Sequence, residues 1–427
     1  MNNIEKIKKI LNEMGHHEIT VKEREDIVFL EGELSSWDDI VNIGLKVSKT
    51  KLYSHVVNNI KLKGFTQKVN KPSIKDLALD NKKVDVLVIG GGVIGAAILR
   101  ELTKYKLSAL LVEKGEDLAL AASSRNDGCI HVGVDLHKGS NKLKYLIKSK
   151  EIIKDLCKEI DVDYHEDGQT VCFKSNLLKP IIRIFFNIRC KQNHIKDWKL
   201  LSRKKLLELE PNLSDEVKFG VFFPHAGSIC PYNFTIALAE SAVINGAEVS
   251  FNTYVRDMTL EDNKITKVIT NRGTIYPKFV INAAGVYNDD IAELAHDKFF
   301  SIHPRKGTDV LMDKSVRKEL SNSGIQIFSI KKKNHSANSK GGGIIPTVDD
   351  NTLVGPNAIE IPDKEDVTTS KEVVDKLFEK HTKTISNLRK GDTITYFSGV
   401  RAPTYEEDFI VSRGKWTKNI AHAAGIQ

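Results

Sequence analysis

Three glycines with a fixed spacing are the first residues of this chain that could do chemistry. Gly90, Gly92 and Gly95 follow a G-x-G-x-x-G pattern. In this pattern the first glycine permits a tight turn, the second admits a pyrophosphate to the backbone, and the third lets a helix pack closely on a strand. Glu113 ends the next apolar run and can accept hydrogen bonds from a ribose diol. The combination predicts a dinucleotide ligand.

The run VDVLVIGGGVIGAAILRELTKYKLSALLVEKG indicates the elements that position these residues. It reads as an apolar strand, a glycine turn, an alanine-rich helix and a second apolar strand that ends in an acid. The N-terminus of that helix would face the phosphates with unpaired N–H groups and the positive end of its dipole. These elements in register are stronger evidence for a dinucleotide than the glycines alone.

A polar, glycine-containing segment, SSRNDGCIHVGVD, begins ten residues after Glu113. A nicotinamide enzyme has no need of such a loop at this place. The pyrophosphate and isoalloxazine ring of a flavin extend across the sheet, and they need hydroxyls and backbone groups along the way. Ser123, Ser124 and Asn126 could supply these contacts, so the segment favours FAD over NAD.

Together with the dinucleotide motif, this segment resembles the D-amino-acid-oxidase-like FAD superfamily. The likeness is greatest to the branch of anaerobic-type glycerol-3-phosphate dehydrogenases and L-2-hydroxyglutarate oxidases, whose loop reads like S-x-x-N-S-G-x-I-H-x-G. Asn126, Gly128, His131 and Gly133 keep this register, while Asp127 stands where the pattern has serine. The resemblance spans residues 84–427. It implies an α/β, Rossmann-like FAD-binding domain of the glutathione-reductase type with an inserted antiparallel-sheet substrate domain.

The resemblance also implies which residues contact the cofactor. In the family, the glycine turn, the polar loop, a later strand and a turn like INAAG all lie against FAD. Small residues in that turn let the backbone pass next to the cofactor. The predicted cofactor-binding residues are Gly90, Gly92, Gly95, Glu113, Lys114, Ser123, Ser124, Asn126, Asp127, Gly128, Val255, Ala284 and Gly285.

A small set of cations and one histidine are the candidates for substrate chemistry. Arg401, in the phrase SGVR, matches the family's arginine that binds the anionic group of the substrate. Its guanidinium has the fork geometry that a carboxylate or phosphate needs. Arg305 and Lys306 either help to hold the anion or cap exposed strand ends. His131 is the candidate for the group near the reacting hydroxyl, with a flavin-positioning contact as the alternative.

An enzyme of this kind oxidises a secondary alcohol or amine by hydride transfer to flavin N5. The phrases SICPYNFTIALAE and IIPTVDDNTLVGP resemble the glycerol-3-phosphate branch, which implies oxidation of glycerol 3-phosphate to dihydroxyacetone phosphate. L-2-hydroxyglutarate, another 2-hydroxy acid or an amino acid is the alternative substrate. A flavin-binding scaffold that docks partners through its N-terminal module is an alternative of a different class. The electron acceptor (oxygen, a quinone or an iron–sulfur partner) stays open.

Residues 1–65 have a pattern of their own. Helical spacing is followed by two strands, a second helix and a closing strand, and the phrases VFLEGEL and VVNNIKL are similar to those of a small α+β module of the BON type. Its histidines, His16, His17 and His55, are expected at the surface. Pro72 breaks a polar linker over 66–83.

Beyond this linker we expect two domains built from separated segments. The FAD-binding domain is predicted over 84–145, 215–290 and 395–427, and the substrate domain over 146–214 and 291–394. The lysine run at 331–333 is expected to form a mobile turn of the substrate domain. The chain ends at NIAHAAGIQ, where the family continues into a helix that stabilises the reduced ring. We therefore expect a truncated chain that binds FAD weakly.

Composition limits the possible partners. Among 427 residues, 64 Lys and Arg stand against 56 Asp and Glu, giving a net charge of +8. The cations are interleaved with acids, so a small anionic substrate is expected and nucleic acid is not. The cysteines are odd in number and form no CxxC pair, which argues against disulfides and a metal site and favours a cytoplasmic protein. No apolar run is long enough to span a membrane, so membrane contact would at most be peripheral, at the inner face.

Overall fold

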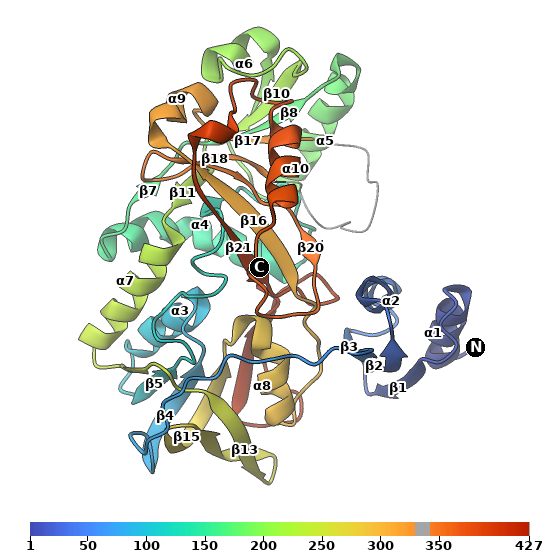
Figure 1. Ribbon diagram of the computed structural model, residues 1–427, viewed down its shortest axis with the longest axis vertical. Helices are drawn as coiled ribbons and strands as arrows, with labels where there is room; N and C mark the ends of the chain where they lie inside the picture. The colour runs from blue at the N-terminus through green and yellow to red at the C-terminus, as the bar shows by residue number, and fades with distance from the viewer. Residues whose placement is uncertain (329–341, 427) are drawn as a thin grey trace.

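A computed structural model describes residues 1–328 and 342–426 (Figure 1). The lysine run at 331–333 lies outside these described residues. Within them no helix is both long enough and apolar enough to cross a membrane. The five cysteines are free thiols, and no cluster of His, Cys, Asp or Glu in the described ranges has the arrangement of a metal site.

The N-terminal module has the predicted order of elements. Strand β1 is antiparallel to β2, and β2 is parallel to β3. Asn2 and Glu5 form a capping box at the start of the first helix. The second helix buries Ile40, Ile43 and Val47, whose helical spacing places them on one face against the sheet. Its likeness to a BON-type module stays a prediction. The elements are α1 (Asn3–Glu13), β1 (Thr20–Arg24), β2 (Ile27–Leu34), α2 (Trp37–Lys49) and β3 (His55–Leu62).

The predicted strand–turn–helix–strand unit lies at the centre of an eight-stranded sheet in the described part of the chain. Its path is β12-β5-β4-β15-β14-β13, with β23 pairing β15 and β22 pairing β23. Strands β12, β5, β4, β15 and β23 are parallel to their neighbours in this series. The strands are β4 (Lys82–Ile89), β5 (Ala109–Val112), β12 (Glu248–Ser250), β13 (Val255–Glu261), β14 (Lys264–Thr270), β15 (Gly273–Asn282), β22 (Ile410–Arg413) and β23 (Ile420–Ala424).

Helices cover both faces of this sheet because its central strand is apolar on both sides. In β4, Val86 and Val88 pack under α3 (Val93–Leu102) and α7 (Pro231–Ile244). Leu87 and Ile89 point to the other face, which holds α8 (Asn288–Leu294). This alternation is what a strand buried in an α/β sheet requires. The fold class predicted for this part of the chain is thereby confirmed.

A second, nine-stranded sheet of the described residues is almost entirely antiparallel. Its path is β20-β16-β19-β18-β17-β8-β10-β9, with β21 beside β16; only β17 and β8 are parallel. Its strands are β8 (Gln169–Phe173), β9 (Lys199–Ser202), β10 (Phe219–Phe223), β16 (Arg305–Met312), β17 (Gly324–Ile327), β18 (Gly343–Pro346), β19 (Thr352–Gly355), β20 (Ile359–Glu360) and β21 (Thr393–Arg401).

Two strands of this second sheet differ from the predicted division of the chain. The sequence predicts that 215–290 and 395–427 belong to the FAD-binding domain, yet β10 pairs β8 and β9, and β21 pairs β16. The reason is that sheet membership depends on long-range pairing, which the local pattern of a strand does not reveal. The remaining domain boundaries stay a prediction.

Smaller elements connect the two sheets and cover their outer faces. A three-stranded sheet joins β6 (Cys129–Ile130), β11 (Gly227–Ile229) and β7 (Tyr164–His165). Figure 1 shows the two large sheets one above the other along the long axis, with the N-terminal module at one side. The other elements are α4 (Asn141–Glu159), η1 (Asn176–Leu178), α5 (Lys179–Gln192), α6 (Arg203–Leu209), η2 (Gly285–Tyr287), η3 (Lys314–Val316), α9 (Arg317–Leu320), α10 (Lys371–His381) and η4 (Lys390–Asp392).

Candidate active site

The glycine turn between β4 and α3 has the close approaches that its sequence predicts. Gly90 has φ +112°, and a Cβ there would overlap the carbonyl oxygen of Ala283. A Cβ at Gly95 would overlap the Gly90 carbonyl oxygen. Gly92 caps α3 without a side-chain hydrogen bond, so the first N–H groups of the helix are left for other acceptors. One of them, Val93 N–H, donates to Ser123 Oγ (2.9 Å).

Glu113 lies directly over this turn. Its Oε2 accepts from Gly91 N–H (2.6 Å) and its Oε1 from Gly115 N–H (2.7 Å). The carbonyl oxygen of Glu113 accepts from Thr253 N–H (2.8 Å), two residues before Val255. The carboxylate therefore stands at the carboxyl end of two parallel strands, where an α/β sheet binds a dinucleotide.

Lys114, the next residue, is held by neighbouring side chains. Its Nζ forms an ion pair with Glu365 and lies 4.4 Å from the centre of the Tyr287 ring. Glu365 also accepts from Tyr287 Oη (2.7 Å) and from Asn70 N–H (2.9 Å) in the linker. Lys114 thus ties the segment around 363–365 and the linker to the end of β5.

The polar loop after β5 is stabilised by its own side chains. Asn126 Oδ1 accepts from Gly128 N–H (2.9 Å), and Asp127 Oδ1 accepts from Cys129 N–H (3.1 Å). These are turns in which a short polar side chain bonds the backbone two residues on. Ser124 Oγ donates to Ala121 O (3.3 Å). Asp127, which replaces the serine of the family pattern, therefore supports the loop as a backbone acceptor.

The INAAG turn lies against the glycine turn. Ala283 N–H donates to Ile89 O (2.9 Å), and the Cα of Ala284 would lie 3.0 Å from a Cβ on Gly90. Asn288 Oδ1 accepts from Ala284 N–H (3.1 Å), and Gly285 has φ +58°. Segments distant in the sequence therefore meet around one turn, as the prediction requires.

Arg401 ends β21 on the side that faces the polar loop. A Cβ on Gly399 would overlap the carbonyl oxygen of Arg125, and a Cβ on Gly307 would overlap the guanidinium of Arg401. Two N–H groups of Arg401 donate to Asn357 O (3.4 and 3.3 Å). Burial lowers the pKa of this guanidinium, and the carboxylates of Asp127 and Asp309 oppose that shift.

Asp309 is an acidic neighbour of Arg401 that the sequence pattern did not reveal. It lies on β16, is 1% exposed, and its Oδ1 is a buried atom without a hydrogen-bond partner among the described residues. Burial and the charge of Asp127 hold the pKa of Asp309 well above its usual range. The phrase TDVLM contained the available signal, because it places a single acid within an apolar strand. An aspartate that is buried in such a strand is rare, so it calls for a specific reason.

Arg305 and Lys306 are both paired with carboxylates. Arg305 is 3% exposed and lies 2.6 Å from Glu360 Oε1 and 2.5 Å from Glu407 Oε1. Lys306 Nζ lies 2.6 Å from Asp366 Oδ2. Both side chains therefore stabilise the fold around β16. Their predicted contact with a substrate anion stays a prediction.

His131 follows β6 in the polar loop. Its Nδ1 accepts from Gly133 N–H (3.1 Å). In a neutral imidazole one nitrogen donates while the other accepts, so this contact places the proton on Nε2. His131 is therefore set up to donate a hydrogen bond from Nε2.

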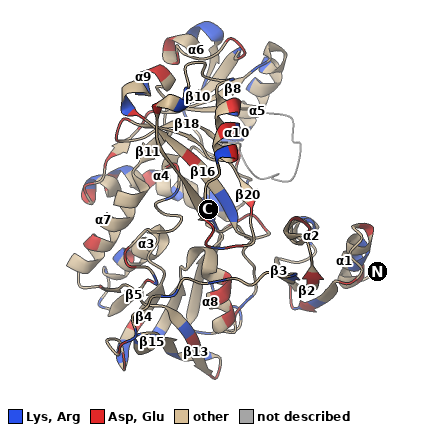
Figure 2. Cartoon of the chain, in the orientation of Figure 1, with Lys and Arg blue, Asp and Glu red and all other residues tan. Residues whose placement is uncertain are grey.

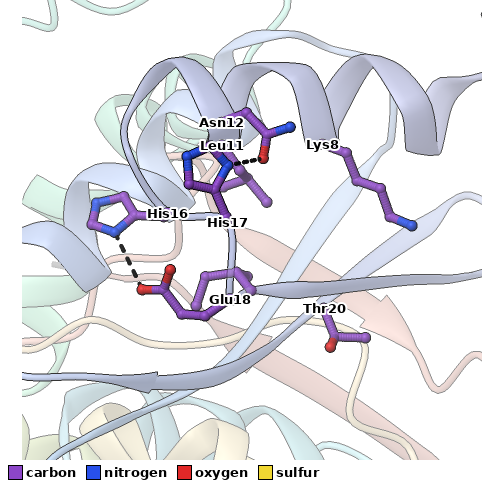
Figure 3. A pocket seen from close by; sticks show the side chains of 8 residues that line it. Lys8, Leu11, Asn12, His16, His17, Glu18 and Thr20 are labelled. Atoms are coloured by element: carbon purple, nitrogen blue, oxygen red, sulfur yellow. Dashed lines mark hydrogen bonds and ion pairs between the residues drawn. The ribbon is translucent and has the colours of Figure 1, made fainter.

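A surface hollow of about 460 Å³ lies on the N-terminal module, away from these residues (Figure 3). Its histidines are engaged locally: His17 Nδ1 lies 2.9 Å from Asn12 Oδ1, and His16 Nδ1 lies 3.7 Å from Glu18 Oε1. None of the predicted cofactor or substrate residues lines it.

The residues around the glycine turn fit an FAD. Cβ atoms at Gly90 and Gly95 would overlap neighbouring carbonyl oxygens, so the turn requires glycines, and the N-cap residue Gly92 offers no side chain to the first N–H groups of α3. Glu113 is the acceptor for a ribose, and the polar loop continues from there toward Arg401.

Comparisons with known proteins agree with this geometry. The model of the FAD dependent oxidoreductase (DAO) family matches residues 85–427. A glycerol 3-phosphate dehydrogenase of Caloramator mitchellensis is 34% identical over 344 residues, which cover 80% of this chain and 70% of that protein. A glycerol 3-phosphate oxidase of Mycoplasma pneumoniae is 30% identical over 287 residues, covering 66% of this chain and 73% of that protein. The solved structure of dithionite-reduced L-α-glycerophosphate oxidase from Mycoplasma pneumoniae with FAD bound superposes with a TM-score of 0.73 at 28% identity, covering 81% and 90% of the two chains.

Proposed function

The chain belongs to the family of FAD-dependent oxidoreductases, and from this premise we propose that it oxidises glycerol 3-phosphate to dihydroxyacetone phosphate. The observation that carries the proposal is Arg401, whose partly buried guanidinium lies beside the polar loop and bonds one backbone carbonyl. A guanidinium has five N–H donors, so further donors are available to an oxyanion. The relatives named as glycerol 3-phosphate enzymes favour a phosphate as that anion.

The charge around Arg401 has a part in this proposal. Asp127 and Asp309 both act on the guanidinium, and two ionised carboxylates would repel a phosphate. Because the pKa of Asp309 is raised, a protonated Asp309 would leave Arg401 opposed by Asp127 alone. We therefore assign to Arg401 the binding of the phosphate. We assign to Asp309 the control of the net charge around the Arg401 guanidinium.

His131 has a narrower role than a general base. Since Nδ1 is engaged by Gly133 N–H, the neutral ring holds its proton on Nε2 and cannot accept a second one there. We assign His131 to donating a hydrogen bond that positions the flavin or the reacting hydroxyl. A bound flavin would accept the hydride from the substrate carbon, and the proton of the substrate hydroxyl would leave to solvent. The acceptor that then reoxidises the enzyme and a location at the inner face of a membrane are further proposals.

Anaerobic mixing of the yellow, FAD-loaded chain with candidate substrates tests the proposed function. Glycerol 3-phosphate should bleach the absorbance of the oxidised flavin, while glycerol, which lacks the anion, should bleach it far more slowly. L-2-hydroxyglutarate is the competing substrate, and faster bleaching by it would replace glycerol 3-phosphate in the proposal. If neither compound bleaches the flavin, both substrate assignments are wrong.

A further inference from the structure

Helix α5 is apolar on two opposite faces. Ile182, Phe186 and Cys190 are buried against the nine-stranded sheet and hold the helix in place. A surface helix in a globular protein is normally polar on its outer side. Here the outer side exposes Ile181 (65%), Ile184 (63%), Phe185 (44%) and Ile188 (53%).

These side chains form one continuous row. Residues 181, 184, 185 and 188 have the i, i+3, i+4, i+7 spacing that places side chains on one helix face. Leu177, which precedes the helix in η1, is 87% exposed and extends the row by one turn. We call these five residues the α5 row. Single exposed apolar residues are common on proteins, whereas a contiguous row indicates a contact surface.

The segment of the chain that carries the α5 row has charges of one sign, although one of its lysines, Lys174, is paired with Glu216 from another segment. From residue 168 to residue 196 the chain contains no Asp or Glu. In most of the molecule, by contrast, positive and negative residues are mixed (Figure 2). The same stretch contains six cations, Lys174, Lys179, Arg183, Arg189, Lys191 and Lys196.

A hollow of about 710 Å³ adjoins the α5 row, and it too is lined by both basic and apolar side chains. Lys179, Arg183 and Lys205 bring positive charge to it, while Ile184 and Trp198 bring apolar surface. Tryptophan is enriched at the boundary between lipid and water, and long basic side chains keep their charge in the headgroup layer. Both components of an interfacial binding site therefore occur together.

We propose that α5 docks the enzyme on the surface of a membrane that contains anionic lipids, with the α5 row among the acyl chains and the surrounding cations among the headgroups. An amphipathic helix with basic flanks binds in this way. At 14 residues, α5 is too short to span a bilayer. A second copy of the chain fits less well, because a stable protein interface uses about 20 to 30 residues on each side. Figure 1 shows α5 beside the upper sheet, away from β4 and β15.

Vesicle co-sedimentation of the FAD-loaded chain of 427 residues tests this proposal independently of the substrate. Wild type should bind vesicles of phosphatidylcholine and phosphatidylglycerol at least about tenfold more strongly than pure phosphatidylcholine vesicles, and high salt should weaken the binding. The double variant Ile184→Glu/Phe185→Glu should lose at least about tenfold in partitioning. Its rate with a soluble dye as electron acceptor should be unchanged.

The matched control changes two exposed apolar residues on a different helix. Val243 (48% exposed) and Ile244 (84%) end α7, and Val243→Glu/Ile244→Glu should bind vesicles as wild type does. The proposal is overturned if wild type ignores anionic vesicles, or if both double variants bind alike. It is also overturned if sedimentation velocity shows a dimer that the α5 variant dissolves while vesicle binding is absent.

Discussion

A backbone contact decides what the imidazole of His131 can do. Gly133 N–H occupies Nδ1, so in a neutral ring Nε2 carries the proton. His131→Gln places an amide donor near the position of Nε2 and should therefore keep most of kcat, whereas His131→Ala should lower it by about 10- to 100-fold. Steady-state kinetics of the two variants distinguishes the roles. Equal losses in both would restore His131 as the proton acceptor.

Asp309 predicts a dependence of stability on pH. Because burial and Asp127 raise its pKa, folded Asp309 keeps a proton that the unfolded chain releases above about pH 4. The free energy of unfolding therefore falls as pH rises from about 4 through the folded pKa. Asp309→Asn removes this loss, so its Tm relative to wild type should increase between about pH 5 and pH 8. A difference in Tm that is constant across this range would contradict the raised pKa.

Residue types could be predicted where the constraint is local. The glycine turn and Glu113 were predicted because a dinucleotide site needs these residues at fixed places within one strand–turn–helix–strand unit. Asp309 was missed because its proximity to Arg401 depends on the pairing of β16 with β21, and these strands are distant in the sequence. The paired state of Arg305 was missed for the same reason, since Glu360 and Glu407 come from later segments.

At the scale of elements, the N-terminal module contacts the segment that follows Arg401. Tyr405 is 4% exposed and joins the core of the module, and a Cβ on Gly44 of α2 would overlap its ring. Asn58 Nδ2 donates to Tyr405 Oη (3.0 Å), and Val56 N–H donates to Glu406 Oε1 (2.8 Å). The module therefore positions the chain just after β21, the strand that ends in Arg401.

Tyr405→Ala should loosen this contact. Removing a buried aromatic side chain costs about 3 to 5 kcal/mol in the free energy of unfolding. Chemical denaturation measures the loss, and trypsin should also cut the linker over 66–83 more quickly. Tyr396→Ala, at a 54% exposed position of β21, serves as the control and should change the free energy by less than about 0.5 kcal/mol. If Tyr405→Ala matches that control, the module is not held by Tyr405.

The order of elements was more predictable than their pairing. Helix and strand patterns in residues 1–65 and the unit around β4 predicted both regions, because hydrophobic spacing is a local property. The positions of β10 and β21 in the nine-stranded sheet were not predicted. The hydrophobic pattern of a single strand does not show which of the two sheets it joins. The contact between the N-terminal module and Tyr405 was not predicted either, because no local sequence pattern indicates it.

For the whole molecule, the distribution of charge says more than its total. The net charge of +8 is spread over mixed surfaces, yet the acid-free stretch around α5 concentrates positive charge beside an apolar row. Gly90 of the dinucleotide turn packs against Ala283, and Gly399 of β21 packs against Arg125, so the polar loop lies next to the strand that ends in Arg401. The proposed substrate oxidation and the proposed membrane docking thus depend on different regions of the chain.

The central claim is that Arg401 binds the anion of the substrate. The most direct test is the KM for glycerol 3-phosphate of Arg401→Ala and Arg401→Lys, measured on protein that retains its flavin, with Arg413→Ala on the exposed end of β22 as the control. Both Arg401 variants should raise KM by more than about tenfold, because an ammonium lacks the guanidinium fork and alanine lacks the charge. The control should keep the wild-type value. Unchanged kinetics in the Arg401 variants would contradict the account.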